Sequence, residues 1–254
     1  MIMFLFLSFL EDSGYMARAA FITDRLFMRL GLSGKFFVPL VMGFGCSVPA
    51  IMSTRTLETE RERRIGVICC PFMSCSARMT VYALFAGTFF EKNRGLVVIS
   101  IYLLGIAAAA VSALILGKTL LRGREAGFIT EIPPYRMPAF RNLWARVGEK
   151  LSEFAGRTAG IIMLASIVIW ILQAYDFSFH RVSAEKSIIF ALGQLAAPVF
   201  SPLGFGNSVS AAAIFAGIGA KEAVVSAFGI LGDIKNAFTP LSAYAFMVFV
   251  LLYT

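Results

Sequence analysis

The sequence predicts an all-α protein, a polytopic bundle of membrane helices built from two repeats that contain broken or re-entrant helices. Three observations carry this prediction. The 254 residues are 58% hydrophobic and 15% charged, whereas a soluble domain has about 25% charged residues. The apolar residues form long segments between polar loops, and two of these segments are interrupted by glycine and proline. Such interruptions are tolerated at membrane depth only where the backbone is buried in protein or lines a wet cavity.

The charge and the cysteines exclude two other classes of protein. The net charge is +8, but the basic residues lie in loops between apolar segments, where they orient membrane helices, so we expect no nucleic-acid partner. The four cysteines, Cys46, Cys69, Cys70 and Cys75, lie in or beside apolar segments. This placement argues against the disulfide framework of a small secreted domain.

The beginning of the chain is apolar and then amphipathic. Residues 1–10 are apolar but too few to cross about 30 Å of hydrocarbon, and the chain also ends within an apolar run, so we expect an internal part of a longer protein. Within residues 15–30, Arg18, Arg25 and Arg29 recur at spacings of seven and four. These spacings put them on one face of a helix that lies at the membrane surface or against the bundle.

The next apolar segment, residues 36–52, does not read as an ordinary membrane helix. It contains Pro39, Gly43, Gly45 and Pro49. Because proline and glycine interrupt a helix, this segment is predicted to form two half-helices or a re-entrant segment.

Three further segments lead to the middle of the chain. Residues 53–64 are predicted to be a charged loop, with four Arg and three Glu. Residues 65–90 are long enough to span the membrane, with a break near Pro71 and with Arg78 near the centre. Residues 95–117 are the clearest span, since none of these 23 residues is charged. Small residues recur every four positions along that span and predict close approach of a neighbouring helix: Gly105, Ala109, Ala113 and Gly117.

The second half repeats this alternation. Residues 118–157 are polar, with a predicted surface helix over 139–156, and residues 158–175 span the membrane again. Lys and Arg concentrate in residues 53–64 and 118–157, which predicts that both lie on the cytoplasmic side.

The last third is apolar but interrupted. His180, the only histidine, lies in the polar loop 176–187 and is expected to be solvated rather than to be a ligand. Residues 188–232 are rich in glycine, are broken by two prolines, and contain Lys221 and Glu222. A last span is predicted to begin at residue 237.

One octapeptide occurs twice. Residues 43–50, GFGCSVPA, recur as residues 204–211, GFGNSVSA, identical at six of eight positions. Paired interruptions in two halves of a membrane protein point to a transport site, because the ends of half-helices and unwound carbonyls can hold an ion near the midplane. A chance match stays open, since Gly, Ala and Ser are common in membrane helices. The interrupting residues are Gly43, Gly45, Pro49, Gly204, Gly206 and Asn207.

Sulfur-containing side chains are the candidate ligands. Cys46 and Cys75 each lie in a break, and Met52 and Met73 are close to them in sequence. Thiolates and thioethers suit soft or borderline cations such as Fe(II), Zn and Cu(I). The alternative is that these cysteines are small buried hydrophobic residues, which is what we expect of Cys69 and Cys70.

Ionisable residues in or against apolar segments are secondary pathway or gating candidates. A charge at the centre of a membrane helix costs about 2.5–3.5 kcal/mol on insertion scales, so each such residue invites a functional hypothesis. The candidates are Glu11, Asp12, Arg78, Lys221 and Glu222. In the alternative interpretation the first two cap a helix at the interface, the last two neutralise each other, and the arginine anchors a loop.

The sequence contains no sign of enzymatic chemistry. The run Gly117-Lys118-Thr119 resembles the end of a phosphate-binding loop, but that pattern requires glycine where the chain has Ser112. No metalloprotease or serine-triad spacing is present either. We therefore expect no enzymatic activity in this chain.

Long stretches of the sequence closely resemble the membrane region of the FeoB ferrous iron transporters. They are LEDSGYMARAAFITDRLF, GLSGKFFVPLVMGFGCSVPAIMSTRTLETERERR, PFMSCSARMTVYALFAG, EIPPYRMP, AGIIMLASIVIW, SPLGFG and AKEAVV. The resemblance implies two gate domains of the nucleoside-transporter type and Fe2+ uptake across the bacterial cytoplasmic membrane. It divides the chain into a first gate domain (1–117, incomplete at its start), a cytoplasmic linker (118–157) and a second gate domain (158–254, incomplete at its end).

The resemblance also implies site residues and partners. The gate cysteines of the family correspond to Cys46 and Cys75, the acidic pair to Glu11 and Asp12, and the second charged pair to Lys221 and Glu222. Fe2+ would be the transported substrate rather than a resident cofactor. GTP and Mg2+ would bind an amino-terminal domain outside this chain, and a small cytoplasmic Feo protein, the lipid bilayer and further copies of the chain would be partners. Two alternatives stay open: a carrier of nucleosides or other organic solutes, and a non-transporting scaffold that assembles partners through residues 118–157.

Overall fold

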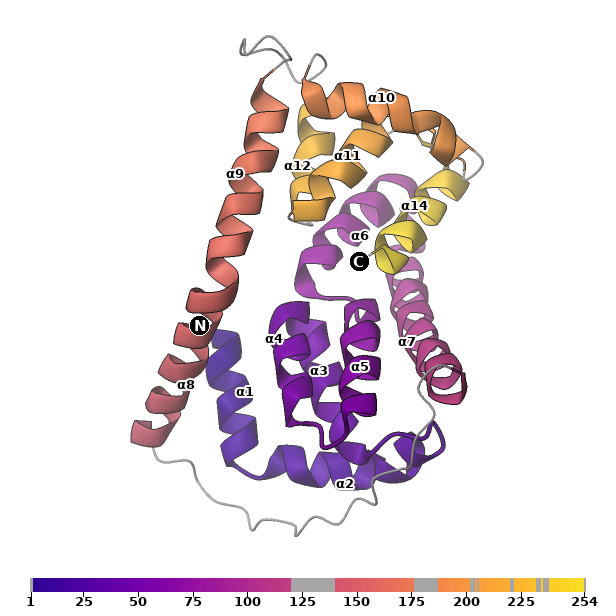
Figure 1. Ribbon diagram of the computed structural model, residues 1–254. Helices are drawn as coiled ribbons and strands as arrows, with labels where there is room; N and C mark the ends of the chain where they lie inside the picture. Colours follow the sequence, from indigo (N-terminus) through magenta and orange to yellow (C-terminus); the bar gives the residue numbers. More distant parts are fainter. Residues whose placement is uncertain are drawn as a thin grey trace. The chain divides into compact units, whose positions relative to one another are not determined.

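The computed structural model describes residues 2–119, 140–175, 187–201, 204, 206–219, 222–231, 234 and 238–253 (Figure 1). Within these ranges the regular secondary structure is helical and no residue lies in a strand. The predicted all-α class is therefore confirmed. In the amino-terminal half the α-helices are α1 (Ile2–Asp12), α2 (Tyr15–Met28), α3 (Phe37–Gly45), α4 (Ser47–Ser53), α5 (Glu60–Cys69), α6 (Ser76–Phe89) and α7 (Arg94–Lys118). In the remainder they are α8 (Phe140–Phe154), α9 (Gly160–Ala174), α10 (Ile188–Phe200), α11 (Ser208–Gly219), α12 (Glu222–Leu231) and α14 (Pro240–Leu252).

The chain separates into two compact units. The first comprises Met1–Cys75 and Leu104–Arg157, and the second comprises Ser76–Leu103 and Thr158–Thr254. Residues 76–103 thus pack with the carboxy-terminal part of the chain. The domain boundaries expected from the sequence stay a prediction.

The interrupted segment 36–52 forms two half-helices, as predicted. Helix α3 ends at Gly45, Cys46 has an extended backbone with φ −154° and ψ 132°, and α4 begins at Ser47. A short 3-10 helix, η1 (Gly34–Phe36), precedes α3. The re-entrant alternative stays a prediction.

The predicted charged loop is shorter than expected. A 3-10 turn, η2 (Thr54–Thr56), occupies its start, and α5 begins at Glu60. The reason is local: Thr59 accepts a hydrogen bond at 3.2 Å from the backbone N–H of Glu62, three residues later, which is the spacing of a helix N-cap. Acidic residues in the first turn of α5 also favour the helix, because its amino-terminal end is partially positive.

Small residues allow α7 to join the core of the first unit. Ala109 and Ala113 are 4% and 3% exposed and belong to one buried cluster with Phe36 and Ile65. The thiol of Cys69 donates to the carbonyl of Ala109 at 3.5 Å. The predicted stripe of small residues is therefore a packing surface, as expected where helices approach closely.

Aromatic rings fill the core of the second unit. The ring of Phe85 on α6 lies 5.3 Å from that of Phe228, 5.2 Å from Phe238 and 5.1 Å from Phe246, measured between centroids. Edge-to-face and offset arrangements at such distances are favourable beyond the area that they bury. This cluster ties α6 to α12 and α14, while α10 and α11 pack on each other beside it (Figure 1).

The two copies of the octapeptide share one structural feature. Helix α4 begins at Ser47 and helix α11 begins at Ser208, and these serines occupy the same position of the repeat. The residue before each, Cys46 or Asn207, is not helical. Both predicted breaks therefore exist, although α3 ends directly before its break and α10 ends earlier, at Phe200.

Two helical segments of the described chain are long and apolar enough to cross a membrane. They are Glu60–Phe89 and Arg94–Lys118. Shorter apolar helices of 10–17 residues accompany them.

Candidate functional site

Cys46 is the joint between two half-helices. Its N–H donates to the carbonyl of Met42 at 3.1 Å, and its carbonyl accepts from Ala50 at 3.4 Å. The last carbonyls of α3 and the first N–H groups of α4 have no partner within their own helices. The thiol of Cys46, which is partly exposed, thus lies where two helix ends of opposite partial charge meet.

Cys75 lies in a second break. The 3-10 helix η3 (Cys70–Phe72) ends α5, and α6 begins only at Ser76. Met73, Ser74 and Cys75 between them are 3%, 2% and 6% exposed. The hydroxyl oxygen of Ser74 is buried without a hydrogen-bond partner in the described chain. Buried polar atoms normally have such a partner, so this break contains a hydroxyl group whose hydrogen-bonding capacity the described residues do not use.

The structure brings these two breaks together through Gly43. A Cβ atom added to Gly43 would lie 3.0 Å from Cβ of Met73, 3.1 Å from its Cγ and 3.3 Å from the carbonyl oxygen of Cys70. A side chain at this position would therefore require Met73 and Cys70 to move by a few tenths of an ångström. Gly43 precedes Cys46 by three residues and Met73 precedes Cys75 by two, so segments adjoining both thiols are in contact.

No ready-made metal cage surrounds these thiols. Across the described residues, no group of three or more His, Cys, Asp or Glu side chains is arranged to hold a metal ion. The arrangement offers separate sulfur ligands and helix ends rather than a closed coordination shell.

The acidic pair at the end of α1 is engaged by α8. Glu11 pairs with Lys150 at 2.5 Å, and Asp12 pairs with Arg146 at 2.6 Å. The Asp12 side chain is 12% exposed. The pair thus attaches the helix of the linker segment to α1, and its role in a pathway stays a prediction.

Charge reversal tests this attachment. Arg146→Glu should lower the unfolding free energy by about 1 kcal/mol, because the largely buried Asp12 carboxylate would face a like charge. Adding Asp12→Arg should restore most of the loss. The measurement is thermal unfolding of the purified full-length protein. Arg141→Glu, at an exposed position of the same helix, is the control, and an equal loss in that variant would contradict the assignment.

Arg78 is completely buried in α6. Its guanidinium donates to the carbonyl of Tyr253 at 3.4 Å, just after the end of α14. This contact agrees with the anchoring alternative: a cation satisfies a carbonyl that the helix leaves without a partner.

Most of the remaining predicted residues lie in or after the second copy of the octapeptide, residues 204–211. The side chain of Asn207 accepts from the backbone N–H of Val209 at 3.4 Å and so caps α11. Gly204 has φ +83°, which favours glycine. A Cβ atom on Gly206 would lie 2.6 Å from Cα of Ser201. Glu222 is the first residue of α12.

Two further predicted residues lie in the first copy of the octapeptide. Pro49 is buried in α4, and Gly45 ends α3. Lys221 lies outside the described residues, as does His180.

Sequence reasoning missed a buried carboxylate. Glu62 on α5 is 3% exposed, and its two carboxylate oxygens accept from the N–H of Ser33 at 2.7 Å and from its hydroxyl at 3.1 Å. The available signal was its position three residues after Thr59, which predicts a helix start but not its distant partner.

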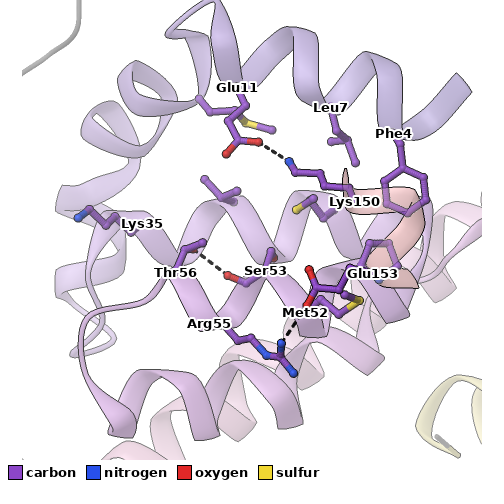
Figure 2. Close-up of a pocket in the computed structure, with 14 residues that line it drawn as sticks. Phe4, Leu7, Glu11, Lys35, Met52, Ser53, Arg55, Thr56, Lys150 and Glu153 are labelled. Carbon is purple, nitrogen blue, oxygen red and sulfur yellow. Dashed lines mark hydrogen bonds and ion pairs between the residues drawn. The ribbon is translucent and has the colours of Figure 1, made fainter. Parts of the chain in front are cut away.

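Sequence reasoning also missed a cavity in the first unit. It has a volume of about 510 Å3 and is lined by fourteen residues of α1, α2, α3, α4 and α8 and of the 3-10 turns η1 and η2. Figure 2 shows charged side chains around it, with Glu11 paired to Lys150 and Arg55 to Glu153. Volumes of this size are typical of sites for small organic molecules, about 300–1,000 Å3.

Comparison with known proteins identifies the family. The Gate family model, described as nucleoside recognition, matches residues 1–89 and 155–254, which include both breaks. A second model, the ferrous iron transport protein B C terminus, matches residues 98–150 between them. The chain belongs to the FeoB family. Membership of the FeoB family places the chain in a membrane.

Individual FeoB relatives align with nearly the whole chain. The Fe(2+) transporter FeoB of Staphylococcus aureus (strain COL) is 45% identical over 99% of this chain and 39% of its own length. The Fe(2+) transporter FeoB of Methanocaldococcus jannaschii is 40% identical over 99% of this chain and 40% of its own length. An Fe(2+) transport protein A/Fe(2+) transporter FeoB fusion protein of Porphyromonas gingivalis is 38% identical over 100% of this chain and 37% of its own length. The chain thus spans about two fifths of the length of these FeoB proteins. No solved structure matches the chain significantly.

Proposed function

We propose that this chain is the membrane permease part of a transporter for Fe2+ uptake in the bacterial cytoplasmic membrane. The observation that carries the proposal is Cys46: a thiol at the joint of two half-helices, in a chain 45% identical to a protein named as an Fe(2+) transporter. The ion passes along the broken helices of the Gate segments. Cys46 and Cys75 serve as transient ligands, and Met73, which lies in the same break as Cys75, assists them.

Weak ligation suits this task. A transported ion must leave as readily as it enters, so a few separated ligands serve better than a closed four-ligand site. Thiolate and thioether sulfur bind Fe2+ in preference to Mg2+ or Ca2+, which favour oxygen. The carbonyl groups at the carboxy-terminal end of α3 add oxygen atoms that can replace water around the ion.

The ionisable residues have supporting roles in this proposal. Glu11 and Asp12 couple the gate to α8 through their ion pairs. Arg78 holds the end of α14, and Lys221 with Glu222 acts at the second gate. Multiple spans cross the membrane, with residues 118–157 on the cytoplasmic side.

The partners follow from the family. A GTP-binding domain of the same protein, with GTP and Mg2+, controls the permease, and a small Feo protein binds on the cytoplasmic side. The relative in which transport protein A is fused to FeoB supports the second partner. The chain acts in a homo-oligomer.

Removing both candidate ligands tests the proposal. In the full-length protein, Cys46→Ser with Cys75→Ser should lower the rate of Fe2+ uptake into cells or vesicles by about tenfold or more. Changing even a residue that only supports a metal ligand costs about 10–100-fold in metal affinity or activity, and these two cysteines are the proposed ligands themselves. The amount of protein inserted in the membrane should not change.

The matched control uses the other two cysteines. Cys69 and Cys70 are 1% and 0% exposed and pack in the core, so Cys69→Ala with Cys70→Ala should retain most uptake. Wild-type uptake in the Cys46 and Cys75 double variant would refute the ligand role.

The second candidate function is a carrier of nucleosides or other organic solutes, which the description of the Gate model favours. Alkylation of Cys46 decides between the two. Protection by Fe2+ but not by nucleosides supports the ion, and the reverse supports the carrier. A non-transporting scaffold predicts that no solute changes the alkylation rate.

A further inference from the structure

The cavity of the first unit has an apolar interior, and none of the proposed Fe2+ ligands Cys46, Cys75 and Met73 lines it. Leu7 of α1, Val38 and Met42 of α3, and Met52 of α4 line it, together with Phe4. Thus aliphatic and thioether side chains from three helices face one volume of about 510 Å3. Moving hydrocarbon from water into such a space is favourable, and the gain grows with each CH2 group that is buried.

Charges of both signs surround the cavity. Lys150 and Glu153 of α8 meet Glu11 of α1 and Arg55 of η2 in two ion pairs, at 2.5 and 3.2 Å (Figure 2). Lys35 also lines the cavity. The paired side chains are between 33% and 59% exposed, so their partners can be exchanged for those of a ligand at modest cost.

This lining selects for an amphiphile with two charges. A purely anionic headgroup would meet the carboxylates of Glu11 and Glu153, and a purely cationic one would meet Lys150 and Arg55. A zwitterion satisfies both, since its phosphate faces the basic side chains and its ammonium faces the acidic ones. Phe4 is the one aromatic ring among the described lining residues, which disfavours a nucleoside that would need stacking partners on its base.

The bilayer is the source of such a ligand. Helix α1 forms one wall of the cavity through Leu7, while Phe6 and Phe9 on the same helix are 60% and 41% exposed. An apolar outer surface of this kind faces lipid in a membrane protein. One helix therefore separates the cavity from hydrocarbon.

We propose that this cavity is a binding site for a zwitterionic phospholipid, with one acyl chain in the apolar interior and the headgroup among the charges of α1, η2 and α8. Because Lys150 and Glu153 belong to α8, the bound lipid lies against the helix of the linker segment and stabilises its docking on α1. This site is independent of the Fe2+ ligands.

Native mass spectrometry of the purified full-length protein tests the site. The protein is equilibrated with vesicles of phosphatidylethanolamine and phosphatidylglycerol in equal amounts and is then transferred to detergent. We expect wild type to retain one phosphatidylethanolamine. Val38→Trp, which fills the cavity, should lower the retained fraction about tenfold, since the acyl chain loses its burial. Val41→Trp, on the same helix but outside the lining, should retain lipid as wild type does.

Two results would overturn the proposal. One is equal retention in the two tryptophan variants, and the other is equal retention of phosphatidylglycerol and phosphatidylethanolamine by wild type. If Val38→Trp does not fold, wild-type protein labelled with phosphatidylethanolamine that carries a photoreactive acyl chain decides the matter. Labelling concentrated in peptides of α1, α3 and α4 supports the site. Labelling spread evenly over the exposed faces of α7 and α9 refutes it.

Discussion

A Gly43→Leu variant of the full-length protein should be strongly destabilised and should transport Fe2+ poorly. Any side chain at this position enters the space of Met73 and the carbonyl of Cys70, at 3.0 to 3.3 Å from the first added atom alone. Overpacking a filled site costs about 1–3 kcal/mol or more. The contact also joins the segments that carry Cys46 and Cys75, so uptake should fall further than expression does. Thermal unfolding in detergent and Fe2+ uptake per inserted molecule are the measurements.

Gly87 provides the matched control for this prediction. It lies in α6, and apart from its chain neighbours and the backbone of its own helix, no atom of the described chain lies within 4 Å of a Cβ atom added there. Gly87→Leu should therefore leave stability near that of wild type or raise it, because leucine favours a helix more than glycine does. If both variants lose the same stability, the close approach at Gly43 is not what the glycine provides.

Replacing Glu62 by leucine should have the second largest effect, on stability rather than on transport. Two donors of Ser33, its N–H and its hydroxyl, would lose their acceptors in a buried site. Each unsatisfied donor costs about 1–3 kcal/mol. Glu62→Gln should lose less, since its amide oxygen still accepts from the N–H and its NH2 group donates to the hydroxyl oxygen. The free energy of unfolding should thus rank wild type, glutamine and leucine in that order.

A neighbouring carboxylate on the same helix tests whether the effect of replacing Glu62 comes from its burial or from its charge. Glu60 pairs with Arg64 at 2.7 Å, but its side chain is 74% exposed. Exposed pairs at this spacing contribute only about 0.2–0.5 kcal/mol, so Glu60→Leu should change stability little. A loss as large as that of Glu62→Leu would mean that the helix start, not the contact with Ser33, is what matters.

Local interruptions explain why the breaks were predictable. Glycine and proline act on the backbone of their own segment. The positions where helices end and begin can therefore be predicted from the two octapeptides, GFGCSVPA and GFGNSVSA. The joint at Cys46 and the start of α11 at Ser208 follow from this local chemistry. The small residues of α7 were predictable for the same reason, since close packing requires them at regular spacing.

Long-range pairing was not predictable. Glu11 and Lys150 are 139 residues apart in sequence, and nothing near either residue specifies the other. Glu62 appeared to be one more charge in a polar loop, because a single sequence does not show that Ser33 lies beside it. The cavity was hidden in the same way, since its walls come from separate helices. Lys221, in the second charged pair, lies outside the described residues, so its role stays a prediction.

The single extended residue between α3 and α4 has a mechanical consequence. Because the chain is helical on both sides of Cys46, the φ and ψ angles of this one residue set the angle between the axes of α3 and α4. Hinges in proteins are often a few residues at the ends of elements that absorb such rotations. Here the hinge residue also carries the thiol. Any rotation that swings α4 relative to α3 therefore turns the sulfur and both helix ends at once. Under the proposed function, opening of the gate and release of the ion would share this one pair of torsion angles.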